Sequence, residues 1–468
     1  MDNQEARAEP GADAAAGHPD PAFPLFHPRP ARGWINDPNG LCYLDGRYHV
    51  FFQYNPDSAR HHRICWGHMS SPDLVHWELH PVALRPQPGG PDALGCWSGV
   101  VTVDGGVPTA AYSGVSAPDG HSQVVLARAS YGLAEWQQEG LVAAPVPADY
   151  SVTAVRDPYL FTFRGRRYAL QGAGLASGHA AVLLYSADQL SDWRYEGIWF
   201  TSEDVLAARH LPAEIWECPQ LVRVPDSSGA ETWLLMASLW LSSDYHHHPN
   251  GVGYLLGSLA EDAATGLPVF TPETGGKADL GPDFYAPQIL SLPDRALLWG
   301  WANEVPGRDG SPGRDEAATD AAGWAGVLTF PRQLAVHGGV LAVEPAPELR
   351  AYRGQQRARG AGGSVYLSAM AEAVVTGGEG RIRLVLASDA EARPVFSDTV
   401  AGGDELRIFV DASIVEVYRH GSVPATVRAY PAPGEEWRLE LPHGAAADVW
   451  DLEQPGTGQR DRGSERRG

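Results

Sequence analysis

The stretch DPNGLCYLDGRYHVFFQYNP, residues 37–56, begins with an aspartate and continues as two apolar runs separated by a tight turn. Four later segments begin in a similar way, and they open at Trp97, Asp157, Glu217 and Asp283. The first three steps, 37 to 97, 97 to 157 and 157 to 217, are 60 residues each, and the last step is 66 residues. A second series at steps of 59 and 57 residues supports the repeat and consists of Trp77, Trp136 and Trp193. Five related units therefore fill about residues 25–330.

Each unit alternates short runs of Val, Ile, Leu, Tyr, Phe and Trp with Gly, Asp, Asn and Pro, a pattern that predicts strands and tight turns. A repeated unit with about four strands is typical of a β-propeller blade. In a propeller the innermost strands begin at the same end of the central channel, so the five opening residues would ring one funnel. The alternative is that these are strand-initiating residues with coincidental spacing, which three equal steps joining three carboxylates disfavour.

The pattern changes after Gly326, where six or seven alternating strands separated by Gly-rich turns predict a β-sandwich of about 120 residues. The sandwich strands carry no carboxylate cluster. The sequence therefore predicts an all-β protein, a five-bladed β-propeller followed by a C-terminal β-sandwich. Its expected parts are a disordered segment 1–24, the catalytic propeller 25–332, the sandwich 333–454 and a disordered tail 455–468.

Composition narrows the classes of function. A net charge of −22 over 468 residues opposes binding to nucleic acid or to an anionic membrane, so a neutral small molecule is the better partner. The four cysteines lack CxxC spacing, which predicts free thiols and no zinc site. The first 30 residues lack a secretory apolar region, and no later window has the roughly 20 apolar residues of a membrane span. We expect a cytoplasmic protein without metal or cofactor, and the oligomeric state stays open.

Three carboxylates on one funnel point to glycoside cleavage. That reaction needs one carboxylate at the anomeric carbon and a second, protonated one to release the leaving oxygen. Asn36 can orient Asp37 by hydrogen bonding, and Arg156 can hold Asp157 ionised while reaching sugar hydroxyls. Glu217 lies in WEC, an apolar setting that suits a general acid. Several tryptophans could pack against a sugar ring, namely Trp34, Trp66, Trp97, Trp216 and Trp240.

These motifs resemble those of glycoside hydrolase family 32, which contains invertases, inulinases, levanases and fructan exohydrolases. The resemblance covers about residues 26–450 and includes WINDPNG (34–40), RDP (156–158) and WEC (216–218). It implies that Asp37 is the nucleophile, that Asp157 stabilises the transition state through fructose hydroxyls, and that Glu217 is the acid/base of a retaining reaction.

Further elements also look like those of the family and imply sugar contacts. They are QYNP with Gln53, WGH with Trp66, WSG with Trp97 and Ser98, and DFYA with Asp283 and Tyr285, alongside Asn36 and Arg156 from the motifs above. RIFVDASIVEVY (407–418) is similar to the family's sandwich signature, although WSGVV lacks the second small polar residue of the commoner WSGS form.

Other motifs have blander interpretations. The run His246–His248 lacks ligand spacing and is predicted as a solvated loop. Residues 308–323 lack the acidic spacing of a calcium loop and are predicted as a mobile loop on the substrate face. Cys218 is expected to be a polarisable neighbour of Glu217 without a redox role. Asp411 and Glu416 are expected to cap strands or to meet the propeller.

The favoured function is a retaining β-fructofuranosidase that acts on sucrose and short fructo-oligosaccharides. A fructosyltransferase, an exo-acting fructanase on inulin or levan, an arabinan-cleaving enzyme and a non-catalytic fructan-binding protein are the alternatives. A phosphorylated sucrose would require cations at the funnel mouth, and few are available. The candidates are Arg60, Arg63, Arg308 and Arg314, so unphosphorylated sugar is expected.

Overall fold

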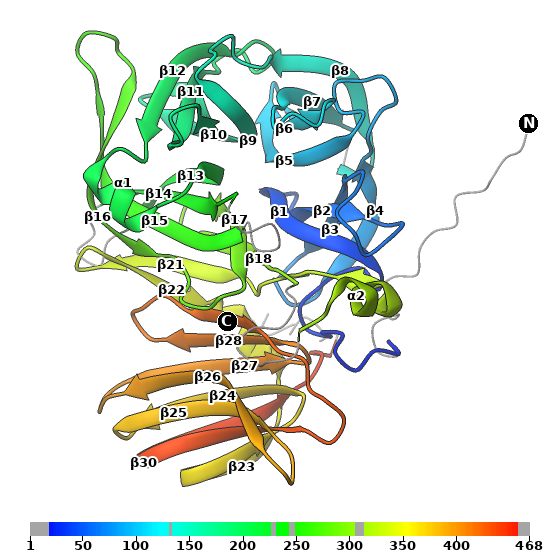
Figure 1. Ribbon diagram of the computed structural model, residues 1–468, viewed down its shortest axis with the longest axis vertical. Helices are drawn as coiled ribbons and strands as arrows, with labels where there is room; N and C mark the ends of the chain where they lie inside the picture. Colours follow the sequence, from blue (N-terminus) through cyan, green and yellow to red (C-terminus); the bar gives the residue numbers. More distant parts are fainter. Residues whose placement is uncertain (1–17, 131–132, 226–230, 243–248, 305–312, 457–468) are drawn as a thin grey trace, which may run out of the picture.

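The computed structural model describes residues 18–130, 133–225, 231–242, 249–304 and 313–456. Within these ranges the chain is almost entirely β-strand, with a ring of sheets in its N-terminal part and a separate pair of layers in its C-terminal part (Figure 1). The predicted propeller followed by a sandwich is confirmed. No helix in the described ranges combines the length and the apolar character that a membrane crossing requires.

The first four blades each contain four consecutive strands. They are β1 (Gly33–Leu44), β2 (Arg47–Asn55), β3 (Cys65–Ser71) and β4 (Glu78–Leu84); β5 (Gly95–Asp104), β6 (Val107–Val115), β7 (Gln123–Ala129) and β8 (Trp136–Ala144); β9 (Val152–Phe163), β10 (Arg166–Leu175), β11 (Ala180–Ser186) and β12 (Arg194–Thr201); and β13 (Ile215–Pro225), β14 (Glu231–Trp240), β15 (Pro249–Glu261) and β16 (Pro268–Lys277). The helix α1 (Val205–His210) connects the third blade to the fourth.

The fifth blade is interrupted by an insertion. Its sheet runs β17 (Phe284–Ser291), β18 (Ala296–Ala302), β21 (Arg332–His337) and β22 (Val340–Pro345). Between β18 and β21 lie α2 (Glu316–Ala322), β19 (Trp324–Ala325) and β20 (Val327–Leu328). Strand β19 pairs in parallel with β1, so the last blade is tied to the first.

Tight turns join the inner strands of the first three blades. Both turn residues have positive φ, at Asp45–Gly46, Gly105–Gly106 and Arg164–Gly165. This is the conformation of the two-residue turn that matches the natural twist of a hairpin, and it explains why Gly recurs at these sites.

Every innermost strand contains a bulge at the same place, where two of its residues face one residue of the neighbouring strand. The bulged pairs are Asn36–Asp37 in β1, Trp97–Ser98 in β5, Asp157–Pro158 in β9, Cys218–Pro219 in β13 and Ala286–Pro287 in β17. A bulge re-aims the side chains around it, and bulges are common beside active sites. The five bulges therefore mark one level of the central channel.

The sandwich consists of two layers that share one long strand. Its strands are β23 (Arg353–Leu367), β24 (Met370–Gly377), β25 (Gly380–Ala387), β26 (Ala392–Val400), β27 (Glu405–Asp411), β28 (Ile414–Arg419), β29 (Ala425–Arg428) and β30 (Glu436–Leu452). Strand β30 pairs with β25 through 436–440 and with β24 through 445–451. Aliphatic side chains such as Ile382, Ile408 and Leu439 fill the space between the layers.

The position of the boundary between the two domains follows from the fifth blade. Strands β21 and β22 pair in sequence with β18, so the blade continues to Pro345 and does not end at residue 332. We propose that the boundary lies at the 3-10 helix Pro347–Tyr352, which separates β22 from β23.

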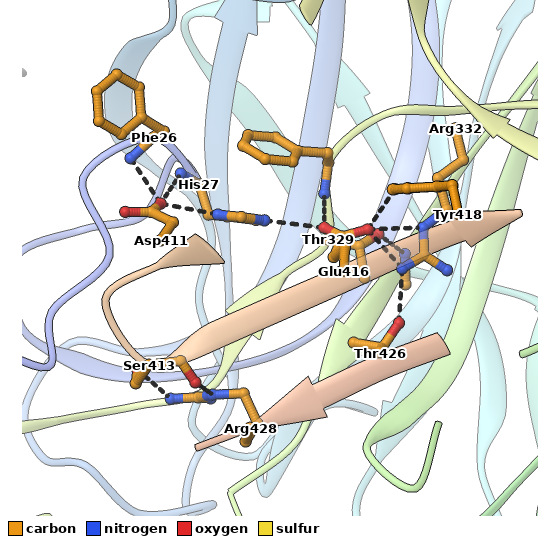
Figure 2. A network of polar contacts seen from close by, with 12 residues as sticks. Phe26, His27, Thr329, Arg332, Asp411, Ser413, Glu416, Tyr418, Thr426 and Arg428 are labelled. Carbon is orange, nitrogen blue, oxygen red and sulfur yellow. Dashed lines mark hydrogen bonds and ion pairs between the residues drawn. The ribbon is translucent and has the colours of Figure 1, made fainter. Parts of the chain in front are cut away.

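A buried polar network joins the two domains (Figure 2). The imidazole of His27 lies 2.8 Å from Asp411 through Nδ1 and 2.8 Å from Glu416 through Nε2. Arg332 of the fifth blade donates to Glu416 from Nη2 at 2.6 Å and to Asp279 from Nη1 at 2.8 Å. All five side chains are buried, so the prediction that Asp411 and Glu416 meet the propeller is confirmed.

Candidate active site

The structure brings the three predicted acids together at the level of the bulges. Asp37 and Asp157 lie within bulges, and Glu217 directly precedes one. Cys218 connects the two aspartates, because its thiol lies 3.5 Å from Asp37 and 3.6 Å from Asp157. Its backbone N–H also donates to Asp157 at 3.0 Å. The thiol therefore neighbours the aspartates more closely than the Glu217 carboxylate that it was expected to influence.

Asp37 is held by three hydrogen-bond donors. Asn36 Nδ2 donates to Oδ1 at 3.0 Å, Gln53 Nε2 donates to Oδ2 at 2.9 Å, and the Ser98 hydroxyl also donates to Oδ2. Burial raises the pKa of Asp37 to about 6, and the charge of Glu217 acts in the same direction while the hydrogen bonds oppose it. Three of the predicted sugar contacts therefore surround this carboxylate and fix its orientation.

Asp157 occupies a strained backbone position. Its φ is +59°, in the left-handed region that non-glycine residues rarely adopt. Its backbone N–H donates to Ser113 Oγ at 2.8 Å, which holds the bulge in place. Burial raises the pKa of Asp157 to about 7, with Glu217 and Asp37 adding to the effect and Arg156 opposing it.

Glu217 has a polar setting, which corrects the apolar one expected from WEC. Arg156 Nε donates to Oε1 at 2.8 Å, and the Tyr285 hydroxyl donates to Oε2 at 2.7 Å. Arg156 also donates to the Gly120 carbonyl at 3.2 Å, so its hydrogen bonds go to Glu217 and to the backbone, not to its neighbour Asp157. The Glu217 side chain is 18% exposed, so it is the most accessible of the three acids.

Aromatic rings surround the mouth of the funnel. Trp34 donates from Nε1 to Asn36 at 3.0 Å and packs against Trp301, with 5.8 Å between the ring centroids. The ring of His61 lies between Trp34 and Trp97, at centroid distances of 6.2 and 5.8 Å. Sequence reasoning missed His61, because nothing in HHR distinguishes it from a solvated loop residue.

Trp66 does not line this mouth, which corrects its prediction as a sugar contact. It is fully buried and packs against Phe51 and Tyr112, while its indole N–H donates to the Trp97 carbonyl at 3.0 Å. It therefore supports the strand that presents Trp97. Trp216 is also fully buried and belongs to the core.

Asp283 does not join the ring of acids either. It is buried, and its carboxylate accepts from the backbone N–H of Arg428 in the sandwich at 2.7 Å. Tyr285 takes the place in the fifth blade that Glu217 has in the fourth, since both directly precede the bulge. The shared Pro-Gln of ECPQ (217–220) and YAPQ (285–288) is the signal that identifies this register.

The described residues contain no group of three or more His, Cys, Asp or Glu side chains arranged to hold a metal ion. His246–His248 and Arg308 lie outside the described residues.

Comparisons with known proteins agree with this geometry. The model of the glycosyl hydrolases family 32 N-terminal domain matches residues 27–345, which end with strand β22. The chain is 34% identical to a sucrose-6-phosphate hydrolase of Klebsiella pneumoniae over 72% of this chain and 69% of that one. It is 33% identical to a raffinose invertase of Escherichia coli over 71% of this chain and 66% of that one.

A solved structure shares the fold. It is a mutant of the Bombyx mori GH32 β-fructofuranosidase in complex with sucrose, with a TM-score of 0.77 and 24% identity over 95% of this chain and 97% of that one. Given the match of the family model over both the funnel and all five blades, the chain belongs to glycoside hydrolase family 32 and is a glycoside hydrolase.

Proposed function

We propose that this chain is a retaining β-fructofuranosidase that releases fructose from sucrose and short fructo-oligosaccharides. The observation that carries the proposal is the set of three carboxylates at one end of the channel, two buried and one more exposed. The names of the relatives support fructose as the sugar, because one hydrolyses sucrose 6-phosphate and another is an invertase.

Asp37 is the proposed nucleophile. Its hydrogen bonds from Asn36, Gln53 and Ser98 stabilise the ionised form that attacks the anomeric carbon, and they orient it toward one face of the sugar. Asp157 lies beside it and is proposed to bind the fructose hydroxyls, as the family resemblance implies. A carboxylate pair of this kind that forms a covalent intermediate gives net retention.

Glu217 is the proposed acid/base. Both of its oxygens accept hydrogen bonds, from Arg156 and Tyr285, which suits the base form that activates water in the second step. In the acid form one oxygen carries a proton, and the Tyr285 hydroxyl can turn to accept it, since a phenol both donates and accepts. The greater exposure of Glu217 leaves it reachable from the leaving-group side.

Unphosphorylated sugar is the proposed substrate, with sucrose 6-phosphate as the rival that the relatives' names suggest. Arg60 is engaged with Glu316 and Asp320, and Arg314 is engaged with Asp20. The positive charge of both guanidinium groups is therefore balanced by carboxylates and is not available for a phosphate.

A cytoplasmic location forms part of the same proposal. The four cysteines of the chain are all unpaired and buried, which supports a reducing compartment.

Steady-state kinetics with sucrose, 1-kestose, sucrose 6-phosphate, inulin and levan test the substrate. We expect higher kcat/KM on the first two, whereas a clear preference for the phosphorylated sugar or for polymer would overturn that part. Chromatography at high sucrose separates hydrolysis from fructosyl transfer. Proton NMR of the first-formed fructose tests retention, and an initial α product would exclude the double displacement. Binding of fructan without any turnover would instead identify a non-catalytic protein.

A further inference from the structure

The loop that joins β2 to β3 places His61 over the funnel. Its ring is edge-on to Trp34, with 80° between the planes, and tilted by 65° from the plane of Trp97. Burial lowers the pKa of His61, although one side of the ring is open to solvent, and the negative charge of Glu217 opposes that shift. His61 therefore lies close enough to Glu217 to be influenced by its charge.

The adjacent residue, Arg60, connects this loop to the insertion of the fifth blade. Its Nε and Nη2 donate to the two oxygens of Asp320 at 2.8 and 2.7 Å, and its Nη1 lies 2.9 Å from Glu316. Nη2 also donates to the Glu316 carbonyl at 3.2 Å. Every nitrogen of the guanidinium group is thus engaged with α2, including one two-pronged contact with a carboxylate.

Helix α2 is itself fixed to the first blade. Asp315 caps its first turn by accepting from the Ala318 N–H at 2.7 Å, and Gly323 ends it with φ of +72°. The Gly323 carbonyl accepts from the Gly33 N–H at 2.9 Å, directly before β19 pairs with β1. The helix is therefore a firm anchor for Arg60.

The backbone of the loop has its own support. Asn55 Nδ2 donates to the Arg60 carbonyl at 2.8 Å and to Ser58 Oγ at 3.0 Å. These bonds hold the main chain up to residue 60 but do not reach the side chain of His61. An exposed ion pair is usually weak, but a two-pronged arginine contact reinforced by a second acid is the exception.

We propose that the contact between Arg60 and α2 is a positioning device that holds His61 against the leaving-group sugar of the substrate. This rests on the proposed function, in which Glu217 protonates the leaving oxygen, so that the side of the funnel near Glu217 and His61 receives the leaving group. A neutral imidazole has one donor and one acceptor nitrogen, which suits the hydroxyls of an uncharged sugar.

The test compares sucrose with methyl β-fructofuranoside, whose leaving group is too small to need His61. His61→Ala should raise KM for sucrose and leave KM for the methyl fructoside within about twofold, with kcat little changed on both. Asp320→Ala and Arg60→Ala should raise KM for sucrose about threefold to fivefold, the upper range for an exposed ion pair. Arg60→Lys should recover part of the loss, since it keeps the charge without the two-pronged contact.

The matched control is Asp57→Ala, which removes an exposed acid from the same loop. It should leave both KM values unchanged. In a His61→Ala background, Asp320→Ala should have no further effect, because both changes act through the same side chain. Equal effects of Asp320→Ala and Asp57→Ala, or additive effects of Asp320→Ala and His61→Ala, would overturn the inference. Failure of the unaltered enzyme to cleave either fructoside would refute the proposed function instead.

Discussion

Replacing Ser98 by alanine should move the acid limb of the activity profile toward higher pH. The Ser98 hydroxyl donates to Oδ2 of Asp37, and both residues are buried. A hydrogen bond to a charged acceptor contributes about 1.5–3 kcal/mol, and one pKa unit corresponds to about 1.4 kcal/mol, so the full loss would be about one to two units. Asn36 and Gln53 remain, and the Gln53 amide, which now also donates to Ser98, can turn fully to Asp37. The expected shift is therefore about one unit.

The sign follows from the form that reacts. A nucleophile must be ionised, so activity is lost as pH falls through the pKa of Asp37, which burial raises to about 6. The measurement is kcat/KM for sucrose from about pH 4 to 9, which reports groups of the free enzyme. Ser186→Ala is the matched control, because that hydroxyl bonds Glu196 in the outer part of the third blade. An acid limb that stays in place or moves to lower pH in Ser98→Ala would refute the reasoning.

Three further outcomes are expected. His27→Gln should cost about 3–5 kcal/mol of unfolding free energy at pH 6. Burial lowers the pKa of His27, but Asp411 and Glu416 outweigh it and raise the pKa above its ordinary value, so this stability is complete below about pH 6.5 and is lost as pH rises through the folded pKa. Denaturant titrations at low and high pH check this, and an equal loss at both would contradict it. Glu217→Ala should slow sucrose about 10²–10⁴-fold and an activated aryl fructoside far less, and equal losses would argue against Glu217 as the acid. A fragment ending at residue 346 should be insoluble in expression trials, because it leaves His27 and Arg332 buried without their carboxylates; a soluble, fully active fragment would contradict this.

The sequence predicts the propeller well because its turns and strand lengths are local properties. Gly at the tight turns and the alternation of apolar runs need no knowledge of distant contacts. The last blade is harder to predict, because residues 303–331 separate β18 from β21. A strand such as β21 has the same pattern whether it completes a blade or starts a sandwich. Only its pairing with β18 decides, and pairing is a long-range property.

The site could be predicted where a residue type is chemically distinctive. Asp37, Asp157 and Glu217 were found because carboxylates at a strand start are unusual. Trp66 was misjudged because a tryptophan in a strand fits a core as well as a sugar contact. His61 was missed because its place depends on α2, more than 250 residues away in the chain.

Equal spacing of the acids is not structural equivalence. Asp37 is the second residue of its bulge, Asp157 is the first residue of its bulge, and Glu217 comes one residue before its bulge. Successive residues of a strand point in opposite directions, so a shift of one residue changes what a side chain faces. Three acids at one equivalent position would lie at one depth and repel one another equally, which would favour protonation of all but one. The staggered arrangement instead leaves two aspartates buried on either side of Cys218 and sets Glu217 further out, beside Arg156. A repeated backbone thus provides five similar bulges, and the unequal positions of the acids give them separate roles in one reaction.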